Sequence, residues 1–193
     1  LDYTGDRWEV EVWGNKLEAI DDGDIASQWF SDFLGVQVRL VHMPSDFVRE
    51  KKGAKFQFAD SYPLLIVSEE SLEDLNKRIV ENGGTPVQIN RFRPNIVVRG
   101  VQPYEEDTWG QIKIGEVGIE VVKPCIRCSI PQVDQSSGVQ GKEPIKTLLS
   151  YRKVSRTEVV FAQKAVPLNQ GIVSKGYTVE VVSVKDAPRL IKN

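Results

Sequence analysis

The sequence has very few residues of the types that most often carry acid–base or metal chemistry. Its 193 residues include one histidine, His42, and two cysteines, Cys125 and Cys128. A structural zinc site needs four nitrogen or sulfur ligands, so this chain would have to complete such a set with a carboxylate. A Ser-His-Asp or Cys-His mechanism would have to use His42, whose apolar neighbours predict a packing residue at the end of a strand. We therefore expect the chemistry to depend on the cysteine pair or on a bound cofactor.

Other absences exclude further classes of protein. The 25 Lys and Arg residues are balanced by 27 Asp and Glu residues, for a net charge of −2, which argues against a dedicated nucleic-acid-binding protein. The sequence contains no Walker loop and no dinucleotide-binding fingerprint, and no apolar run approaches the roughly 18 residues of a membrane span. We see no signal peptide at its start. With two reduced thiols, we expect an intracellular setting, either cytoplasmic or in a compartment that the sequence does not specify.

Helices are predicted at three places. Ile25, Trp29 and Phe33 recur at intervals of four residues and form a broad apolar stripe on a first helix. A second helix is predicted over residues 68–83, beginning at a serine N-cap and ending at a glycine. A third, short helix is predicted over residues 144–151, with proline at its first position.

The rest of the chain reads as short strands separated by Gly, Pro or Asn. Closely spaced short strands with few helices are typical of a barrel or a sandwich, so we predict a mostly β chain with a few helices and a β-barrel-like fold. The predicted strands are residues 8–12, 17–20, 36–42, 96–98, 111–114, 117–123, 127–133, 159–161 and 177–184.

The pair Cys125 and Cys128, at C-x-x-C spacing, is the most specific chemical pattern. Two such cysteines can form a redox disulfide, supply half of a zinc site, ligate another metal through one thiolate, or be buried structural thiols. Pro131 disfavours the helix that a thioredoxin-type pair requires, and zinc lacks further ligands. Arg127 lies between the cysteines, and a cation beside a thiol favours the nucleophilic, metal-binding thiolate. A structural role and a metal-binding role both remain open.

Arg91 and Arg93 form a second candidate. Pro94 biases Arg93 toward extended backbone, and two alternate residues of an extended segment point to the same face. Such a pair can bind a phosphate or a carboxylate, or it can be an ordinary charged surface. A third candidate is the polar turn at residues 58–63, which can present N–H groups and hydroxyls to a ligand or can be only a turn.

Several segments, taken together and in order along nearly the whole chain, match one family. They are Phe58-Ala59-Asp60-Ser61-Tyr62-Pro63, residues 68–76, residues 91–98, residues 104–109, Cys125-Ile126-Arg127-Cys128, Val133-Asp134, Gly138, residues 142–148 and residues 176–181. On these segments the chain resembles the MOSC domain, in the branch that contains the mitochondrial amidoxime-reducing component and its bacterial relatives. The resemblance implies a MOSC-type β-barrel. It also implies that residues 1–36 are the end of an N-terminal β-barrel segment and that residues 37–193 are the MOSC domain.

The resemblance further implies a molybdenum–molybdopterin cofactor. It makes Cys128 the metal ligand and the catalytic residue and assigns Cys125 a supporting role. The cofactor contacts that it implies are Arg93, Asn95, Ile126 and Arg127, with Asp60 and Ser61 as weaker candidates. The family's N-terminal segment carries a Lys-Ser pair that also contacts the pterin. That pair is not visible in the sequence, so we expect the cofactor to be absent from this chain alone. Pyridoxal phosphate binding is implied only as a family-level association.

The activity implied by the resemblance is the reductive removal of oxygen from N-hydroxylated or related small-molecule substrates. The sequence has no cysteines beyond Cys128, so no ferredoxin-type cluster follows the domain. The electrons would then come from a separate donor, cytochrome-b5-like or ferredoxin-like. A second hypothesis is a carrier module for the molybdenum cofactor or for sulfur, because MOSC domains also occur at the C-terminus of molybdenum cofactor sulfurases.

Overall fold

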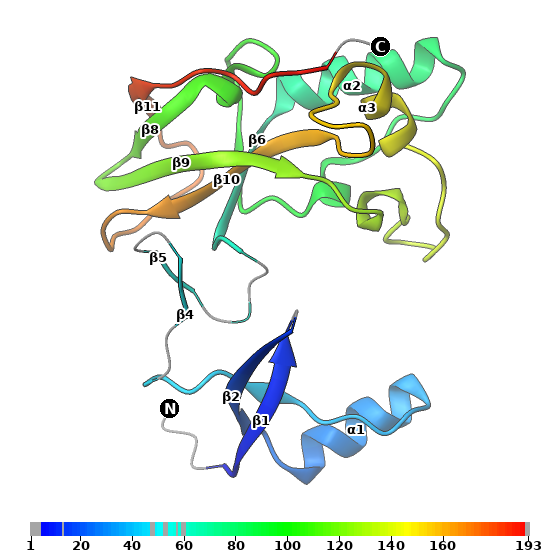
Figure 1. Ribbon diagram of the computed structural model, residues 1–193, viewed down its shortest axis with the longest axis vertical. Helices are drawn as coiled ribbons and strands as arrows, with labels where there is room; N and C mark the ends of the chain where they lie inside the picture. The colour runs from blue at the N-terminus through cyan, green and yellow to red at the C-terminus, as the bar shows by residue number, and fades with distance from the viewer. Residues whose placement is uncertain are drawn as a thin grey trace. The chain divides into compact units, whose positions relative to one another are not determined.

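The computed structural model describes residues 5–12, 14–46, 49–51, 54–56, 58 and 61–191. The chain divides into two compact units, Leu1–Ser61 and Tyr62–Asn193. Figure 1 shows the elements of each unit in the colours of the chain. The two units are described separately below.

The first unit contains a three-stranded antiparallel sheet of β1 (Arg7–Val12), β2 (Asn15–Asp21) and β3 (Val41–His42), in the order β1-β2-β3. The helix α1 (Asp24–Leu34) lies between β2 and β3 in the chain, and the short strands β4 (Arg49–Lys51) and β5 (Ala54–Phe56) pair with each other. The predicted place of His42 at a strand end is confirmed. Its Nδ1 lies 2.8 Å from Asp22 Oδ1.

The apolar stripe of α1 does not face the core of the first unit. Ile25, Trp29 and Phe33 are 91%, 61% and 76% exposed, whereas the buried side chains of the helix are Ser27 and Ser31. Ser31 Oγ donates to the carbonyl of Val38 and accepts from its N–H, so a polar face holds the helix to the following segment. For the same reason the strand predicted at 36–42 is shorter than expected. Within residues 36–40, Val38 bonds to Ser31 of the helix and the carbonyl of Leu40 accepts from the N–H of Asp22, and only β3 joins the sheet.

The second unit is built on a curled six-stranded sheet. Its strands are β6 (Leu64–Ser68), β7 (Ile96–Val98), β8 (Trp109–Ile114), β9 (Val117–Ile126), β10 (Val160–Pro167) and β11 (Val179–Val184), in the order β11-β8-β9-β10-β6-β7. All neighbours are antiparallel except β6 and β7, which are parallel. The prediction of a mostly β chain with a few helices is confirmed.

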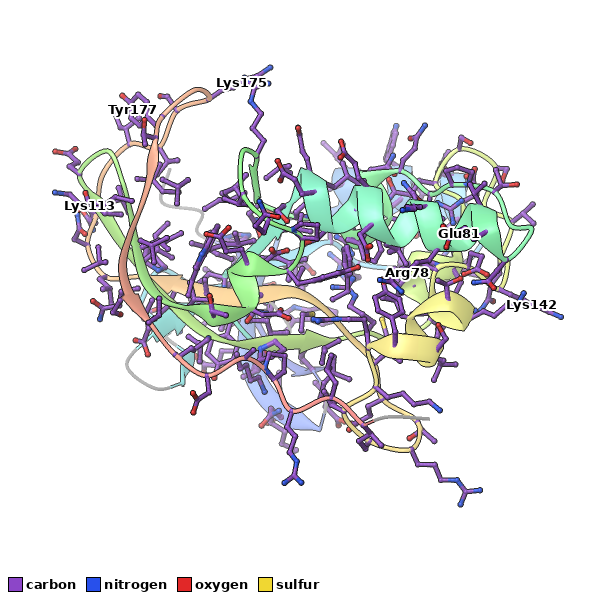
Figure 2. The ribbon with its side chains drawn as sticks, turned by 90° about the horizontal axis from the view of Figure 1, so that it is seen from above. Arg78, Glu81, Lys113, Lys142, Lys175 and Tyr177 are labelled. Carbon is purple, nitrogen blue, oxygen red and sulfur yellow. The ribbon has the colours of Figure 1, made fainter. Side chains whose placement is uncertain are left out.

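Two helices pack side by side on the second unit, as both views show (Figures 1 and 2). They are α2 (Glu69–Glu81) and α3 (Ile145–Tyr151). Ser68 caps α2 by accepting from the N–H of Ser71 at 3.1 Å, as the sequence predicts. Leu75 and Ile79 of α2 and Leu148 of α3 share one buried cluster with residues of the sheet.

Three short 3-10 helices complete the unit: η1 (Ile89–Phe92), η2 (Glu105–Thr108) and η3 (Ile130–Gln132). The strand predicted at 127–133 is wrong, because β9 ends at Ile126 and η3 follows. Pro131 lies in the first turn of η3, where its fixed φ and missing N–H suit a helical turn better than a strand ladder. Because a helical turn replaces the predicted strand, the segment after Cys128 does not continue β9.

The carboxyl group of Glu106 is a buried polar group on which α2 and η2 converge. Glu106 is 1% exposed, and it accepts hydrogen bonds from Ser71 Oγ at 2.8 Å, from Ser68 Oγ at 3.0 Å and from the N–H of Ser68 at 3.2 Å. Burial raises the pKa of Glu106 even though these hydrogen bonds lower it.

A raised pKa makes the contribution of Glu106 to stability depend on pH. The stability that it contributes is fully present below the unfolded pKa of about 4.3 and is lost as pH rises through the higher folded pKa. We expect the free energy of unfolding of Glu106→Gln to fall less than that of the unmodified chain over this rise. Urea denaturation at a series of pH values measures the difference. Glu81→Gln, at the exposed last residue of α2, should follow the unmodified chain. Parallel curves for all three proteins would contradict the prediction.

Candidate functional site

The two cysteines lie at the end of β9 in different environments. Cys125 lies within β9 and is 7% exposed, whereas Cys128 lies two residues beyond the strand and is exposed, and both thiols are free. Val160 of β10 pairs with Ile126, and Gln163 pairs with Pro124. Two residues of β10 therefore oppose Cys125 in a bulge, which bends the strand and re-aims the end of the ladder.

The bulge residues connect the cysteine segment to η1. Ala162 adopts a left-handed conformation with φ 69°, and the ring of its neighbour Phe161 packs 4.3 Å from the ring of Phe92, measured between centroids. Phe92 is the last residue of η1 and is 1% exposed. The start of β10 and the end of η1 therefore meet in the core.

Arg127 bridges the same two segments from the cysteine side. Its Nη1 donates to Cys125 Sγ at 3.1 Å, its Nη2 donates to the carbonyl of Phe92 at 3.3 Å, and its guanidinium lies 5.3 Å from the centre of the Phe92 ring. Its buried Nε has no hydrogen-bond partner in the part of the chain that the structure describes. The sequence left open which cysteine Arg127 faces. It is the buried Cys125, and this leaves the exposed Cys128 thiol without a hydrogen-bond partner among the described residues.

The prediction that Arg91 and Arg93 share one face of an extended segment is wrong. Arg91 lies within η1, and the N–H of Arg93 donates to the carbonyl of Asn90 at 3.0 Å, which closes the turn with Arg93 in a left-handed conformation of φ 54° and ψ 49°. Pro94 disfavours the right-handed helical region at Arg93, and the turn satisfies that restriction with the left-handed region instead of extended backbone. The side chain of Arg93 is exposed and has no partner among the described residues, whereas the side chain of Arg91 forms an ion pair with Asp134.

Asn95 is held by the adjacent strand β6. Its N–H donates to the carbonyl of Leu65 at 3.0 Å, and its Oδ1 accepts from the N–H of Leu65 at 2.8 Å. These bonds use the acceptor of the side chain and leave its amide NH₂ group as a donor toward solvent. Asn95 is thus a positioned donor at the start of β7.

The remaining predicted site residues lie in different parts of the chain. Ile126 is 46% exposed and lies between the two cysteines. Ser61 is half-buried and is the last residue of the first unit, whereas Asp60 lies outside the described residues. The structure therefore connects Arg127, between the cysteines, to Phe92, the residue that precedes Arg93. The pairing of Arg91 with Asp134 could not be predicted from the sequence, because a contact across 43 residues has no local signature.

A cavity of about 810 Å³ lies at the opposite end of β9 from the cysteines. It is lined by residues of β8, of the turn between β8 and β9, of the segment before β11 and of β11 itself, including Lys113, Glu116, Tyr177 and Glu180. Figure 2 shows Lys113 and Tyr177 at the end of the second unit opposite Arg78 and Lys142. None of the predicted cofactor-binding residues lines this cavity.

Among the described residues, no group of three or more His, Cys, Asp or Glu side chains is arranged to hold a metal ion. The helices of this described part of the chain are all too short or too polar to cross a membrane.

Comparison with known proteins identifies the family. The model of the MOSC domain matches residues 53–180 of the chain. The chain belongs to the MOSC family. This bears out the resemblance seen in the motifs, and the mostly β, curled sheet of the second unit is consistent with the MOSC-type β-barrel fold.

Curated relatives are 35–38% identical to this MOSC protein over stretches that cover most of its chain. The mitochondrial amidoxime reducing component 2 of Bos taurus is 38% identical over 78% of this chain and 47% of its own length. The mitochondrial amidoxime-reducing component 1 of Homo sapiens is 36% identical over 87% of this chain and 54% of its own length. The molybdenum cofactor sulfurase of Oryza sativa subsp. japonica is 35% identical over 75% of this chain and 20% of its own length. The chain thus spans about half the length of the amidoxime-reducing relatives.

The difference in burial predicts that the two thiols react at very different rates. We expect one fast-reacting thiol per folded chain toward Ellman's reagent, Cys128, while Cys125 reacts only after unfolding in guanidinium. Cys128→Ser should abolish the fast reaction, and Cys125→Ser should preserve it. Loss of the fast phase in Cys125→Ser, rather than in Cys128→Ser, would contradict the assignment.

Proposed function

We propose that this MOSC protein holds a molybdenum–molybdopterin cofactor through Cys128 and takes part in the reductive removal of oxygen from N-hydroxylated or related substrates. The names of its relatives, amidoxime-reducing components and a molybdenum cofactor sulfurase, support an association with this cofactor. The single observation that carries the proposal is the exposed thiol of Cys128, which has no hydrogen-bond partner among the described residues and follows Arg127, whose buried Nε also has none there.

The donor set fits the chemistry of the cofactor. A thiolate is a soft ligand, which suits a metal that is already bound by the dithiolene sulfurs of the pterin. The terminal phosphate of the pterin needs cationic and amide donors. Among the residues that the structure describes, nothing binds the buried Nε of Arg127, the guanidinium of Arg93 or the amide NH₂ group of Asn95.

Each of the candidate site residues would have a separate role in the mechanism. When bound, the cofactor supplies the two-electron reduction of the substrate, as cofactors generally supply the difficult step. Cys128 would hold the metal, Arg93 and Arg127 would neutralise the phosphate, and Asn95 would donate to the pterin or its phosphate. Ile126, half-exposed between the cysteines, would cover the site with an apolar side chain and exclude water from one side of the metal ligand.

Several further parts of the proposal follow from the resemblance. Residues 1–36 would be the end of an N-terminal barrel segment, and residues 37–193 would be the MOSC domain. Asp60 and Ser61 would add weaker contacts from the turn that precedes β6. Within these 193 residues the two cysteines are too few for an iron–sulfur cluster, so the electrons would come from a separate cytochrome-b5-like or ferredoxin-like donor or from a part of the full protein outside this sequence.

Elemental analysis of the full-length protein tests the metal ligand. We expect Cys128→Ala to lose most of the molybdenum that the unmodified protein retains after gel filtration, because the thiolate is the protein's own bond to the metal. Cys125→Ala is the matched control and should retain the metal, since its thiol is buried against Arg127. Equal molybdenum content in the unmodified protein and in Cys128→Ala would refute the assignment.

The relative named molybdenum cofactor sulfurase supports an alternative, a carrier of the cofactor or of sulfur. In that case Cys128 would hold a cofactor or a persulfide for transfer. Assay of the loaded full-length protein with an amidoxime and a chemical reductant separates the two hypotheses. We expect many product molecules per molybdenum, whereas a carrier would yield at most about one. Cys128→Ala should abolish turnover.

A further inference from the structure

Arg91 ties the segment that follows Cys128 to the 3-10 helix η1. Its side chain is 15% exposed, its Nη2 lies 2.7 Å from Asp134 Oδ2, and its Nη1 donates to the carbonyl of Pro131 at 3.2 Å. A third contact joins the same two segments, because Gln135 Nε2 donates to the carbonyl of Asn90 at 2.6 Å. The planar guanidinium can make both of its contacts at once, which a lysine ammonium at that site would not reproduce in the same geometry.

The acceptor of this contact is itself held in place. Asp134 Oδ1 accepts from the N–H and hydroxyl groups of both Ser136 and Ser137, while its Oδ2 faces Arg91. The hydrogen bonds from Ser136 and Ser137 hold the pKa of Asp134 well below its usual range. The carboxylate thus stays charged at neutral pH and keeps a fixed orientation toward the guanidinium.

These contacts place Cys128 between two attachments to η1. On one side Arg127 bonds to the carbonyl of Phe92, the last residue of η1. On the other side Pro131 and Asp134 are bound by Arg91, which lies within η1. The backbone of Cys128 is therefore fixed relative to the segment that directly follows η1, and that segment carries Arg93 and Asn95.

We propose that Arg91 and Asp134 form a clamp that fixes the Cys128 thiol relative to Arg93 and Asn95, so that Arg91 is a positioning residue of the cofactor site. The proposal rests on the function proposed above, because the thiol and the donors matter together only if one group binds both. The clamp acts on local geometry, and partners that orient metal ligands typically change metal affinity by about 10–100-fold.

The experiment compares Arg91→Met and Arg91→Lys with the unmodified full-length protein loaded with cofactor. Arg156→Met is the matched control, because Arg156 is an exposed arginine of the same unit. We expect molybdenum to dissociate about 10–100-fold faster from Arg91→Met and its sulfur-to-metal absorption to shift. Arg91→Lys, which keeps the charge opposite Asp134, should restore part of both. Hydrogen exchange of the cofactor-free protein should be faster across residues 129–141 in Arg91→Met and unchanged in Arg156→Met.

The outcomes separate the clamp from the function on which it rests. Unchanged dissociation and absorption in Arg91→Met, with a loaded unmodified protein, would overturn the clamp and leave the proposed function intact. An unmodified protein that binds no molybdenum would overturn both. If Arg91→Met fails to fold by circular dichroism, Asp134→Asn takes its place. It weakens the same ion pair from the other side, so we expect faster dissociation, and normal dissociation would count against the clamp.

Discussion

The arrangement of the candidate site depends on one guanidinium group, that of Arg127. It contacts a buried thiol in the sheet, Cys125, and the carbonyl and ring of a buried residue in η1, Phe92. Because both partners belong to the core, the cation is anchored by packing and not by a mobile surface contact. The neighbours of Arg127 in the chain, Ile126 and Cys128, are both exposed. One anchored residue thus presents the residues on either side of it to solvent at a defined place.

The strand opposite Arg127 is held by a second buried polar cluster. Gln163 of β10, which pairs with Pro124, donates to Asp107 Oδ1 at 2.6 Å, and Arg152 Nη2 lies 2.7 Å from Asp107 Oδ2. Buried charges are tolerated only where they are paired in this way. The cluster fixes β10 on both sides of the bulge that opposes Cys125, since Arg152 Nε also donates to the carbonyl of Val160. Residues 104–109, which match the family as a sequence motif, therefore have a structural explanation in the support of the strand beside the site.

Local patterns predicted the elements well and their contacts poorly. The helix that begins after Ser68 and the strands on either side of Gly115 have strong local signatures, a cap and an apolar alternation, and the structure has them. The orientation of α1 could not be predicted, because an apolar stripe shows which face is apolar but not whether the first unit covers it. The conformation of Arg93 depends on a turn closed by Asn90, and the role of Arg91 depends on Asp134. Both are tertiary or turn-level contacts that a two-residue periodicity does not represent.

The scarcity of reactive side chains in this chain is consistent with a site whose chemistry comes from a cofactor. The two cysteines are chemically alike, and burial alone distinguishes their thiols. Cys125 is buried against Arg127, whereas Cys128 is exposed. In the proposed function such a site requires only one thiolate and a few oriented donors, and residues 92–95 and 125–128 would provide them. The same arrangement serves a reductase and a carrier equally, because each must hold the cofactor. The difference between them lies in the supply of electrons, for which these 193 residues contain no cysteine set of their own.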